Sequence, residues 1–468
     1  MIFFKLLSTY KNYLIVFLLP VSFLFGQAYV SILLLLFVVL FFLLLDSFKK
    51  LPILNDTIIV SIFIFFTFLI ISSILNIKKE FAANIFSLDS YNFQLIFDSV
   101  RKLSFLFFFF CLYILLSKEK FFFLKNLQNS YFKFLSIIIL FLIFDSLFQF
   151  MHPNRENLFG FKPTDLNTEM RLTSVFNNEP IVGSFLFHMG LVPMIFLIYY
   201  IKDKIKNFFY LFLITNLLIL TYLITVFLSG ERISFLMTLS SVIFILLSFK
   251  DLRKYLISLF FFSIFFLIII FNNSYFNDRY KILYKEISGK MHDSQPVFDE
   301  KNSKYRDRSF FDSQWGAHYL TAYEMFKNYP FFGVGIRQFR YKCQETKYEI
   351  INSEAYKMRC SSHPHNLYAE ILSETGLFCF LSFLSILLFI TIRVIRVIKE
   401  YKFEKSNYLS YRIFLSTAIC VLFIFIPIKS TGSFFSNFYG TIIWLNITFL
   451  FTYLKFFEKN LNIKKVIK

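Results

Sequence analysis

The sequence predicts an all-α, polytopic membrane protein with about twelve transmembrane helices. Of its 468 residues, 57% are hydrophobic, and the mean hydropathy is +0.61. Long apolar runs recur along the whole chain, and a run of about 18 residues is long enough to cross a bilayer. Because the bilayer interior offers no water to the backbone, each such run must be helical. This pattern excludes an ordinary soluble protein.

The apolar runs give the individual spans. The first run follows Lys5 and Lys11 as a signal peptide would. It continues almost directly into the second run, so we expect a retained first helix. The predicted spans cover residues 13–26, 28–46, 56–76, 103–117, 131–151, 181–201, 207–228, 232–248, 255–271, 366–390, 412–428 and 438–455.

Basic residues predict the orientation, because cytoplasmic loops are enriched in Lys and Arg. We therefore expect a multi-pass protein of the bacterial inner (cytoplasmic) membrane with both termini in the cytoplasm. The loop near 77–102, on the outer side, carries four basic residues and is the weakest point of this topology. The short, basic cytoplasmic segments are then 1–12, 47–55, 118–130, 202–206, 249–254, 391–411 and 456–468.

The net charge of +19 fits basic loops at an anionic membrane surface. No zinc-finger, RNA-binding or helix-turn-helix signature accompanies this charge, so we expect no nucleic-acid partner.

One long outer segment, residues 272–365, divides the chain. Residues 1–271 hold nine predicted transmembrane helices with short loops, and residues 366–468 hold three more and a cytoplasmic tail. In the long segment, apolar residues at helical spacing predict a helix over about 309–327. The block NYPFFGVG that follows is expected to form a turn or re-entrant element. No strand precedes its glycines, so they are not a dinucleotide fingerprint.

Cysteines differ by location. Cys343 and Cys360 both lie in the long outer segment, where an oxidising periplasm would let them form a disulfide. The sequence does not show whether their Cα atoms come within the roughly 7 Å that a disulfide requires. The other cysteines, which lie in predicted spans and are expected to be packing residues, are Cys111, Cys379 and Cys420.

Polar clusters converge on one membrane boundary in this topology. They are Arg171 in RLTSVFNNEP, Arg232 in SGER, and the stretch SSHPHNLYAEILSETG at 361–376. Arg232 could be an interfacial anchor. However, it lies on the outer side, against the positive-inside bias, in a very short loop. Paired with Arg171 it would suit a phosphate group, because Arg binds phosphate bidentately and stays charged.

His363 and His365 flank Pro364 and allow three interpretations: an ordinary surface loop, a metal site, or a general base. No third and fourth ligand is spaced convincingly for a metal, so we expect neither metal nor cofactor. A histidine titrates near neutral pH and can take a proton from an alcohol. Glu370 and Glu374 follow and enter a span, where carboxylates need partners. We expect them to orient the site or to bind substrate.

In these motifs the sequence resembles the O-antigen ligase and O-antigen polymerase superfamily of bacterial membranes. The most specific part is His365-Asn366, with Leu367, Glu374 and Gly376 following. YPFFGVG is nearly as typical, and RLTSVFNNEPIVGSFL and SGERISFL match weaker arginine motifs. The resemblance covers about half of the chain. Glu231 departs from the pattern, since a small residue is usual before the arginine; its carboxylate could dampen the positive field or clamp Arg232.

The resemblance implies a helical GT-C-type fold and metal-independent glycan transfer from a polyprenyl-pyrophosphate donor at the periplasmic face. It implies that His365 is the base and that the pyrophosphate or substrate is bound by Arg171, Arg232, Arg308, His363 and Glu374. The acceptor would be lipid A-core in a ligase or a second carrier-linked unit in a polymerase, and the motifs favour the ligase slightly. A protein O-oligosaccharyltransferase and a lipid-linked glycan transporter remain alternatives.

Overall fold

The computed structural model is almost entirely helical, as predicted. The one exception within its described residues is a short antiparallel hairpin of β1 (Val297–Asp299) and β2 (Lys304–Arg306). The structure describes residues 14–49, 55–76, 91–117, 125–162, 171–177, 179–288, 297–299, 304–306, 313–349, 354–401, 408–427 and 429–467.

Within the part of the chain that the structure describes, eight helical segments are long and apolar enough to cross a membrane. Each lies on a predicted span: α4 (Thr57–Leu75), α5 (Tyr91–Ser117), α7 (Lys125–Met151), α8 to α9 (Val182–Phe185, Leu191–Lys204), α10 (Phe208–Leu228), η5 to α12 (Arg253–Leu256, Ile257–Asn272), α17 (Leu367–Glu400) and α19 (Asn437–Ile467).

Four shorter apolar helices lie on the remaining predicted spans. They are Leu14–Leu24, α2 (Gln27–Leu43), α11 (Arg232–Ser248) and α18 (Tyr408–Ile424). The structure therefore matches the predicted order of apolar segments, while the count of twelve spans stays a prediction.

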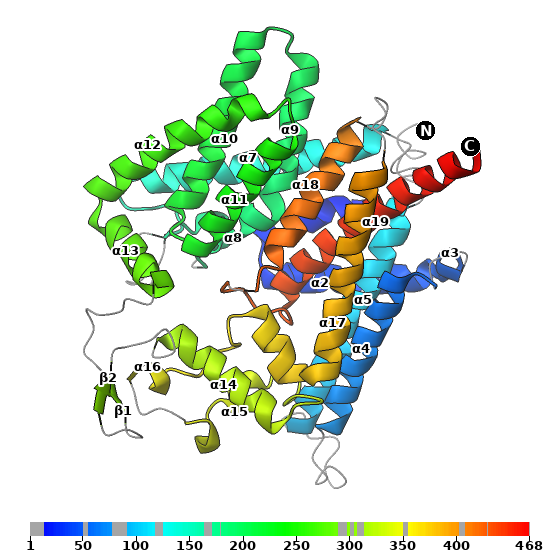
Figure 1. Cartoon of the computed structure of the whole chain (residues 1–468), viewed down its shortest axis with the longest axis vertical. Coiled ribbons are helices and arrows are strands. Elements are labelled where there is room, and N and C mark those ends of the chain that lie inside the picture. Colours follow the sequence, from blue (N-terminus) through cyan, green and yellow to red (C-terminus); the bar gives the residue numbers. More distant parts are fainter. Residues whose placement is uncertain are drawn as a thin grey trace.

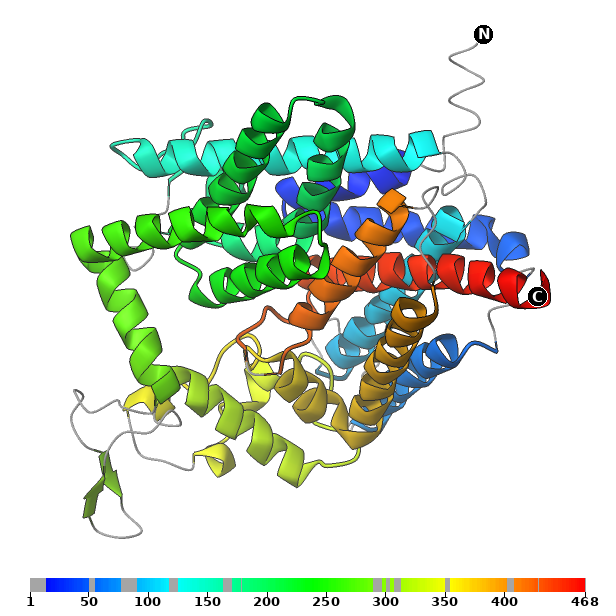
Figure 2. The ribbon, with the colours of Figure 1, turned by 45° about the horizontal axis from the view of Figure 1, so that its top comes forward.

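The helices pack as two groups joined by α18. One group contains α2, α4, α5, α17 and α19, and the other contains α7 and α9 to α12 (Figures 1 and 2). Helix α18 packs against α9 and α11 on one side and α19 on the other. Chain segments from both halves of the sequence thus share one hydrophobic core.

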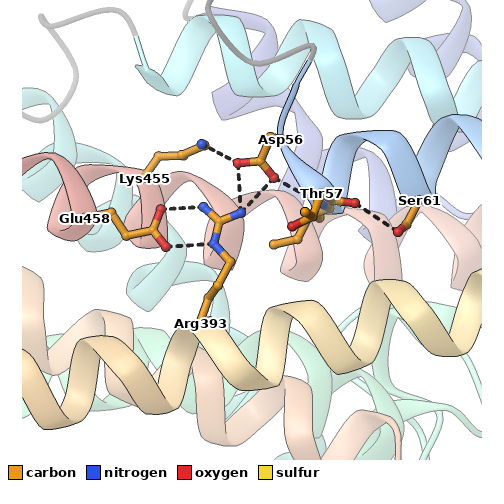
Figure 3. A network of polar contacts seen from close by, with 7 residues as sticks. Asp56, Thr57, Ser61, Arg393, Lys455 and Glu458 are labelled. Carbon is orange, nitrogen blue, oxygen red and sulfur yellow. Dashed lines mark hydrogen bonds and ion pairs between the residues drawn. The ribbon is translucent and has the colours of Figure 1, made fainter.

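An ion-pair network joins three helix ends that the sequence placed in the cytoplasm. Arg393 of α17 donates to Asp56, the N-cap of α4, at 2.7 Å and to Glu458 of α19, also at 2.7 Å (Figure 3). Lys455 pairs with Asp56 as well. The network therefore places three predicted cytoplasmic segments at one end of the molecule.

Asp251 makes an equivalent connection in the second helix group. It pairs with Lys202 at 2.8 Å and with Arg412 at 3.0 Å, so the loops after α9 and α11 meet the start of α18. Most of the long segment lies at the opposite end, where α14 (Gln314–Asn328), α15 (Phe339–Lys342) and α16 (Glu354–Lys357) gather (Figure 1). Its first helix, α13 (Ser274–Ser288), follows α12 directly.

The loop near 77–102 belongs to this second end. Asn76 donates to the carbonyl of Gly333 at 3.2 Å, and Asp98 pairs with Arg337 at 2.9 Å. Residues 77–90 lie outside the described part of the chain, but both flanks of the loop contact the long segment. The structure therefore places both flanks of this loop beside residues 333–337 of the long segment.

The two most specific motifs interlock through their backbones. Val334 N–H donates to the carbonyl of Ser373 at 2.9 Å, and Gly335 N–H donates to that of Glu374 at 2.8 Å. Gly376 interrupts α17 with φ of 78°. A Cβ atom there would lie 2.3 Å from the carbonyl carbon of Phe331. YPFFGVG therefore forms a turn against the α17 kink, and glycine is needed for the close approach.

The remaining predictions for the long segment concern the helix α14 and the cysteines. Helix α14 begins at Gln314, capped by Ser313, and the predicted start over 309–312 lies outside the described residues. Cys343 and Cys360 form a disulfide, with their Cα atoms 5.3 Å apart. Cys111, Cys379 and Cys420 are free and buried.

Candidate functional site

A cavity of about 880 Å³ lies among loops and helix ends that the sequence predicts on the outer side. Four of the predicted site residues line it, and they come from distant parts of the sequence: Arg171, Arg232, His363 and His365. The tertiary structure therefore brings together the three clusters that the topology placed at one boundary. The rest of the lining includes both polar and apolar side chains, and the apolar ones include Leu24, Phe25, Phe185, Met237 and Phe438.

His365 is held in an unusual backbone conformation. Its φ is +55°, in the left-handed backbone region that residues other than glycine rarely adopt. Its carbonyl oxygen accepts a hydrogen bond from Thr431 N–H at 2.8 Å. The ring lies 4.9 Å from that of Trp315 and 4.1 Å from that of His363. Backbone strain of this kind gathers at functional sites, and it supports a functional role for His365.

His363 is positioned through both ring nitrogens. Nδ1 lies 2.9 Å from the Ser362 hydroxyl, and Nε2 lies 3.1 Å from the carbonyl oxygen of Thr431. Since a carbonyl only accepts, Nε2 carries the proton. The His318 ring stacks 5.2 Å from that of His365, and its Nε2 donates to Met358. Three imidazoles therefore form a contiguous row beside the cavity.

Burial lowers the pKa of every histidine in this row. The pKa of His365 falls to about 3, through burial first and then through His363 and His318. The pKa of His363 falls to about 4, mainly through burial. All three rings are therefore neutral at pH 7, and a neutral imidazole is the form that can accept a proton. No group of three metal-binding side chains with suitable geometry occurs among the described residues.

Asn366 and Glu370 connect α17 to the loop between α18 and α19. Asn366 caps α17 by accepting from the N–H groups of Tyr368 and Ala369, both at 3.0 Å. Its amide donates to the carbonyls of Pro427 and Lys429. The carboxylate of Glu370, one turn later, accepts from Phe434 N–H at 2.7 Å and from Ser433. These residues hold the backbone that carries His365.

Glu374 does not line the cavity. Its buried carboxylate accepts from the backbone N–H groups of Arg337, at 2.6 Å, and Phe339, at 3.1 Å. The geometry therefore favours the orienting role over the substrate-binding role that the sequence left open. Arg308, another predicted substrate contact, lies outside the described residues.

A buried polar cluster holds the loop that carries Arg171. Gln149 of α7 accepts from Thr173 N–H at 3.0 Å and from Ser174 N–H at 2.9 Å, and Asp145 accepts from the Ser174 hydroxyl. The guanidinium of Arg171 donates to the carbonyl of Pro180 at 2.8 Å. Helix α7 thereby fixes the loop at the cavity wall.

Glu231, which precedes Arg232 in the sequence, binds the start of α8. Its carboxylate accepts from the N–H groups of Gly183 at 2.7 Å and Ser184 at 3.1 Å, at the start of α8, and from the Ser234 hydroxyl. Burial raises its pKa, while Arg171 opposes that shift. These hydrogen bonds of the Glu231 carboxylate thus go mainly to the start of α8.

Three residues at the cavity were missed in the sequence: Trp315, His318 and Lys429. Trp315 and His318 lie on α14, and only the tertiary structure packs them against His365. Lys429 lines the cavity and is 5% exposed. The sequence did indicate Lys429, because it is a lone cation in a predicted outer loop, as Arg232 is.

The helices and this cavity define a polytopic membrane protein whose polar residues gather at one end. A family model described as O-antigen ligase matches residues 217–384, from α10 into α17. The match confirms the predicted superfamily of O-antigen ligases and polymerases. It indicates glycan transfer in a bacterial membrane, with lipid-linked glycans as substrates. No curated protein matches the chain.

Proposed function

We propose that the protein is a metal-independent O-antigen ligase, which transfers a glycan from a polyprenyl-pyrophosphate carrier to lipid A-core at the periplasmic face of the inner membrane. The observation that carries this proposal is the shared cavity of Arg171, Arg232 and His365. It joins a candidate base to two permanent cations, which are the groups that this reaction needs.

In this mechanism His365 removes the proton from the acceptor hydroxyl as that oxygen attacks the anomeric carbon. The glycosidic bond to the pyrophosphate breaks, and the released carrier pyrophosphate retains the electron pair. Arg171 and Arg232 stabilise the negative charge that grows on the leaving group. Direct displacement by the acceptor inverts the anomeric centre.

The neutral state of His365 agrees with the role of a base, although a pKa of about 3 makes the empty-site imidazole a weak one. Binding of an anionic pyrophosphate nearby favours the protonated form and raises that pKa. The donor would therefore activate the base that its own reaction requires. The apolar part of the cavity wall suits the first isoprene units of the carrier.

The test uses purified protein, a carrier-linked glycan, and either lipid A-core or a second carrier-linked unit as acceptor. We expect transfer to lipid A-core, unaffected by EDTA, and a loss of about 100-fold or more in the His365→Ala variant. The control is His152→Ala, because His152 does not line the cavity. Undiminished transfer by His365→Ala would refute the base assignment.

The product separates the related alternatives. Longer carrier-linked chains, with lipid A-core unused, would identify a polymerase. Transfer to a protein acceptor would identify an oligosaccharyltransferase. Movement of the carrier-linked glycan across vesicles without any transfer would identify a transporter.

A further inference from the structure

Lys429 is a buried cation in the loop between α18 and α19. Its side chain lines the cavity, and the residue is only 5% exposed. The ammonium nitrogen lies 5.2 Å from the ring centre of Phe187. Among the residues that the structure describes, no carboxylate lies within ion-pair distance of it. The cation–π contact is therefore its main compensation for burial.

Lys429 is held in place by the same motif that carries His365. Its carbonyl oxygen accepts from the Asn366 side chain at 3.2 Å. Two residues later, Thr431 N–H donates to His365 and the Thr431 carbonyl accepts from His363. The lysine is thus built into the wall of the site and is not a mobile surface side chain.

Burial of an ammonium group without an anion is costly even after relaxation. A cation–π contact recovers only part of this cost. The carboxylates of the cavity do not supply the difference. Glu231 is committed to the start of α8, and Glu179 is exposed. The remaining charged groups at the wall, Arg171 and Arg232, are cations and cannot supply it either.

We propose that Lys429 is a third cation of the cavity and binds the pyrophosphate of the lipid-linked donor together with Arg171 and Arg232. The chemical class of the ligand rests on the proposed function, while the need for an anion rests on the geometry alone. Burial lowers the pKa of Lys429 to about 7, and a bound anion would restore its full charge. The buried ammonium therefore destabilises the protein when the site is empty and contributes to binding when an anion occupies the site.

This assignment makes two opposite predictions for one variant. Lys429→Met removes an unpaired buried charge, so the ligand-free protein should unfold at the same or a higher temperature. The same change removes a contact to phosphate oxygens, so undecaprenyl pyrophosphate should bind about tenfold or more weakly. Binding of undecaprenol, which lacks the pyrophosphate, should not change. A structural role alone would instead lower the unfolding temperature and leave the preference for pyrophosphate intact.

The experiment compares the detergent-purified wild type with Lys429→Met, Lys429→Gln and Lys429→Arg. Lys429→Gln replaces Lys429→Met if the latter does not fold, and Lys429→Arg should retain most of the affinity. Lys250→Met, at an exposed position, is the matched control. Equal affinity of wild type and Lys429→Met for undecaprenyl pyrophosphate would overturn the inference.

Two further measurements test the identity of the anion and the proposed function separately. If Lys429→Met raises only the KM for lipid A-core, the anion is an acceptor phosphate and the donor assignment is wrong. If wild type binds undecaprenyl pyrophosphate through Lys429 but transfers no glycan, the inference stands and the proposed function fails.

Discussion

The backbone N–H of Thr431 donates a hydrogen bond to the carbonyl oxygen of His365 at 2.8 Å. This bond joins the loop between α18 and α19 to the residue before the cap of α17. It helps to stabilise the left-handed backbone of His365, whose φ is +55°. The candidate base is thus placed by a segment more than sixty residues further along the chain.

Gly376 provides the first prediction, because its position leaves no room for a Cβ atom. The Gly376→Ala variant would place that atom 2.3 Å from the backbone of Phe331, at a φ of 78°. We expect a loss of stability of about 3 kcal/mol or more, from backbone strain plus a steric clash. The measurement is thermal unfolding in detergent.

Gly160→Ala is the matched control for Gly376→Ala. Gly160 has an almost identical φ of 79°, but no atom lies within 4 Å of its Cβ position. Only the cost of the left-handed backbone remains there, about 1–2 kcal/mol. Equal destabilisation by the two variants would show that YPFFGVG does not pack against the α17 kink.

The buried histidines predict a loss of stability in acid. Burial lowers the pKa of His363 from 6.5 to about 4, so the unfolded chain binds a proton in this interval that the folded protein resists. The contribution is complete above pH 6.5 and decreases as the pH falls towards 4. The stability lost through His363 reaches about 2 kcal/mol at pH 5. Unfolding measured at pH 7 and pH 5 should show a smaller decrease for His363→Gln than for wild type, and parallel decreases would contradict the shifted pKa.

Arg393 is expected to be one of the most important charges for stability. Its side chain is 11% exposed and joins Asp56 to Glu458. Arg393→Met should cost about 3 kcal/mol, because it removes the partner of Glu458 and leaves the buried Asp56 with Lys455 alone. The exposed Arg396 lies one helical turn away, and Arg396→Met should change the stability by less than about 0.5 kcal/mol. Similar unfolding temperatures for both variants would mean that the network of Figure 3 contributes little.

The two ends of the molecule predict opposite labelling patterns. A cysteine at Tyr323, which is 54% exposed on α14, should react with an impermeant maleimide in intact spheroplasts. A cysteine at Lys250, exposed at the other end, should react only after permeabilisation. The buried free cysteines should give a low background. The reverse pattern would place the cavity in the cytoplasm and contradict the proposed function.

The sequence was most informative where a property depends on local pattern. Apolar runs gave the helices, because a span long enough to cross a bilayer must satisfy its backbone internally. Charge predicted which loops share a side, and the ion pairs of Asp56 and Asp251 agree with that grouping. The motif around His365, together with the weaker arginine motifs, indicated the superfamily and four residues of the cavity wall.

Only the tertiary structure shows which contacts each motif residue makes. In the sequence, Glu374 and His365 belong to one motif, and Glu231 looks like a neighbour of Arg232 that could weaken it. In the fold, Glu374 binds the backbone of Arg337 and Phe339, and Glu231 binds the start of α8. These partners are distant in the chain, so no local spacing predicts them.

By itself, then, the sequence determined that the chain is a helical membrane protein of a glycan-transferring superfamily, with polar clusters at one boundary. Only the tertiary structure decided that Arg171, Arg232, His365 and Lys429 share one cavity. The physical reason is that apolar periodicity fixes each helix separately, whereas a cavity depends on how helices from both halves of the chain pack. Lys429 illustrates this difference, because the sequence shows that the residue is charged, whereas only the fold shows that it is buried.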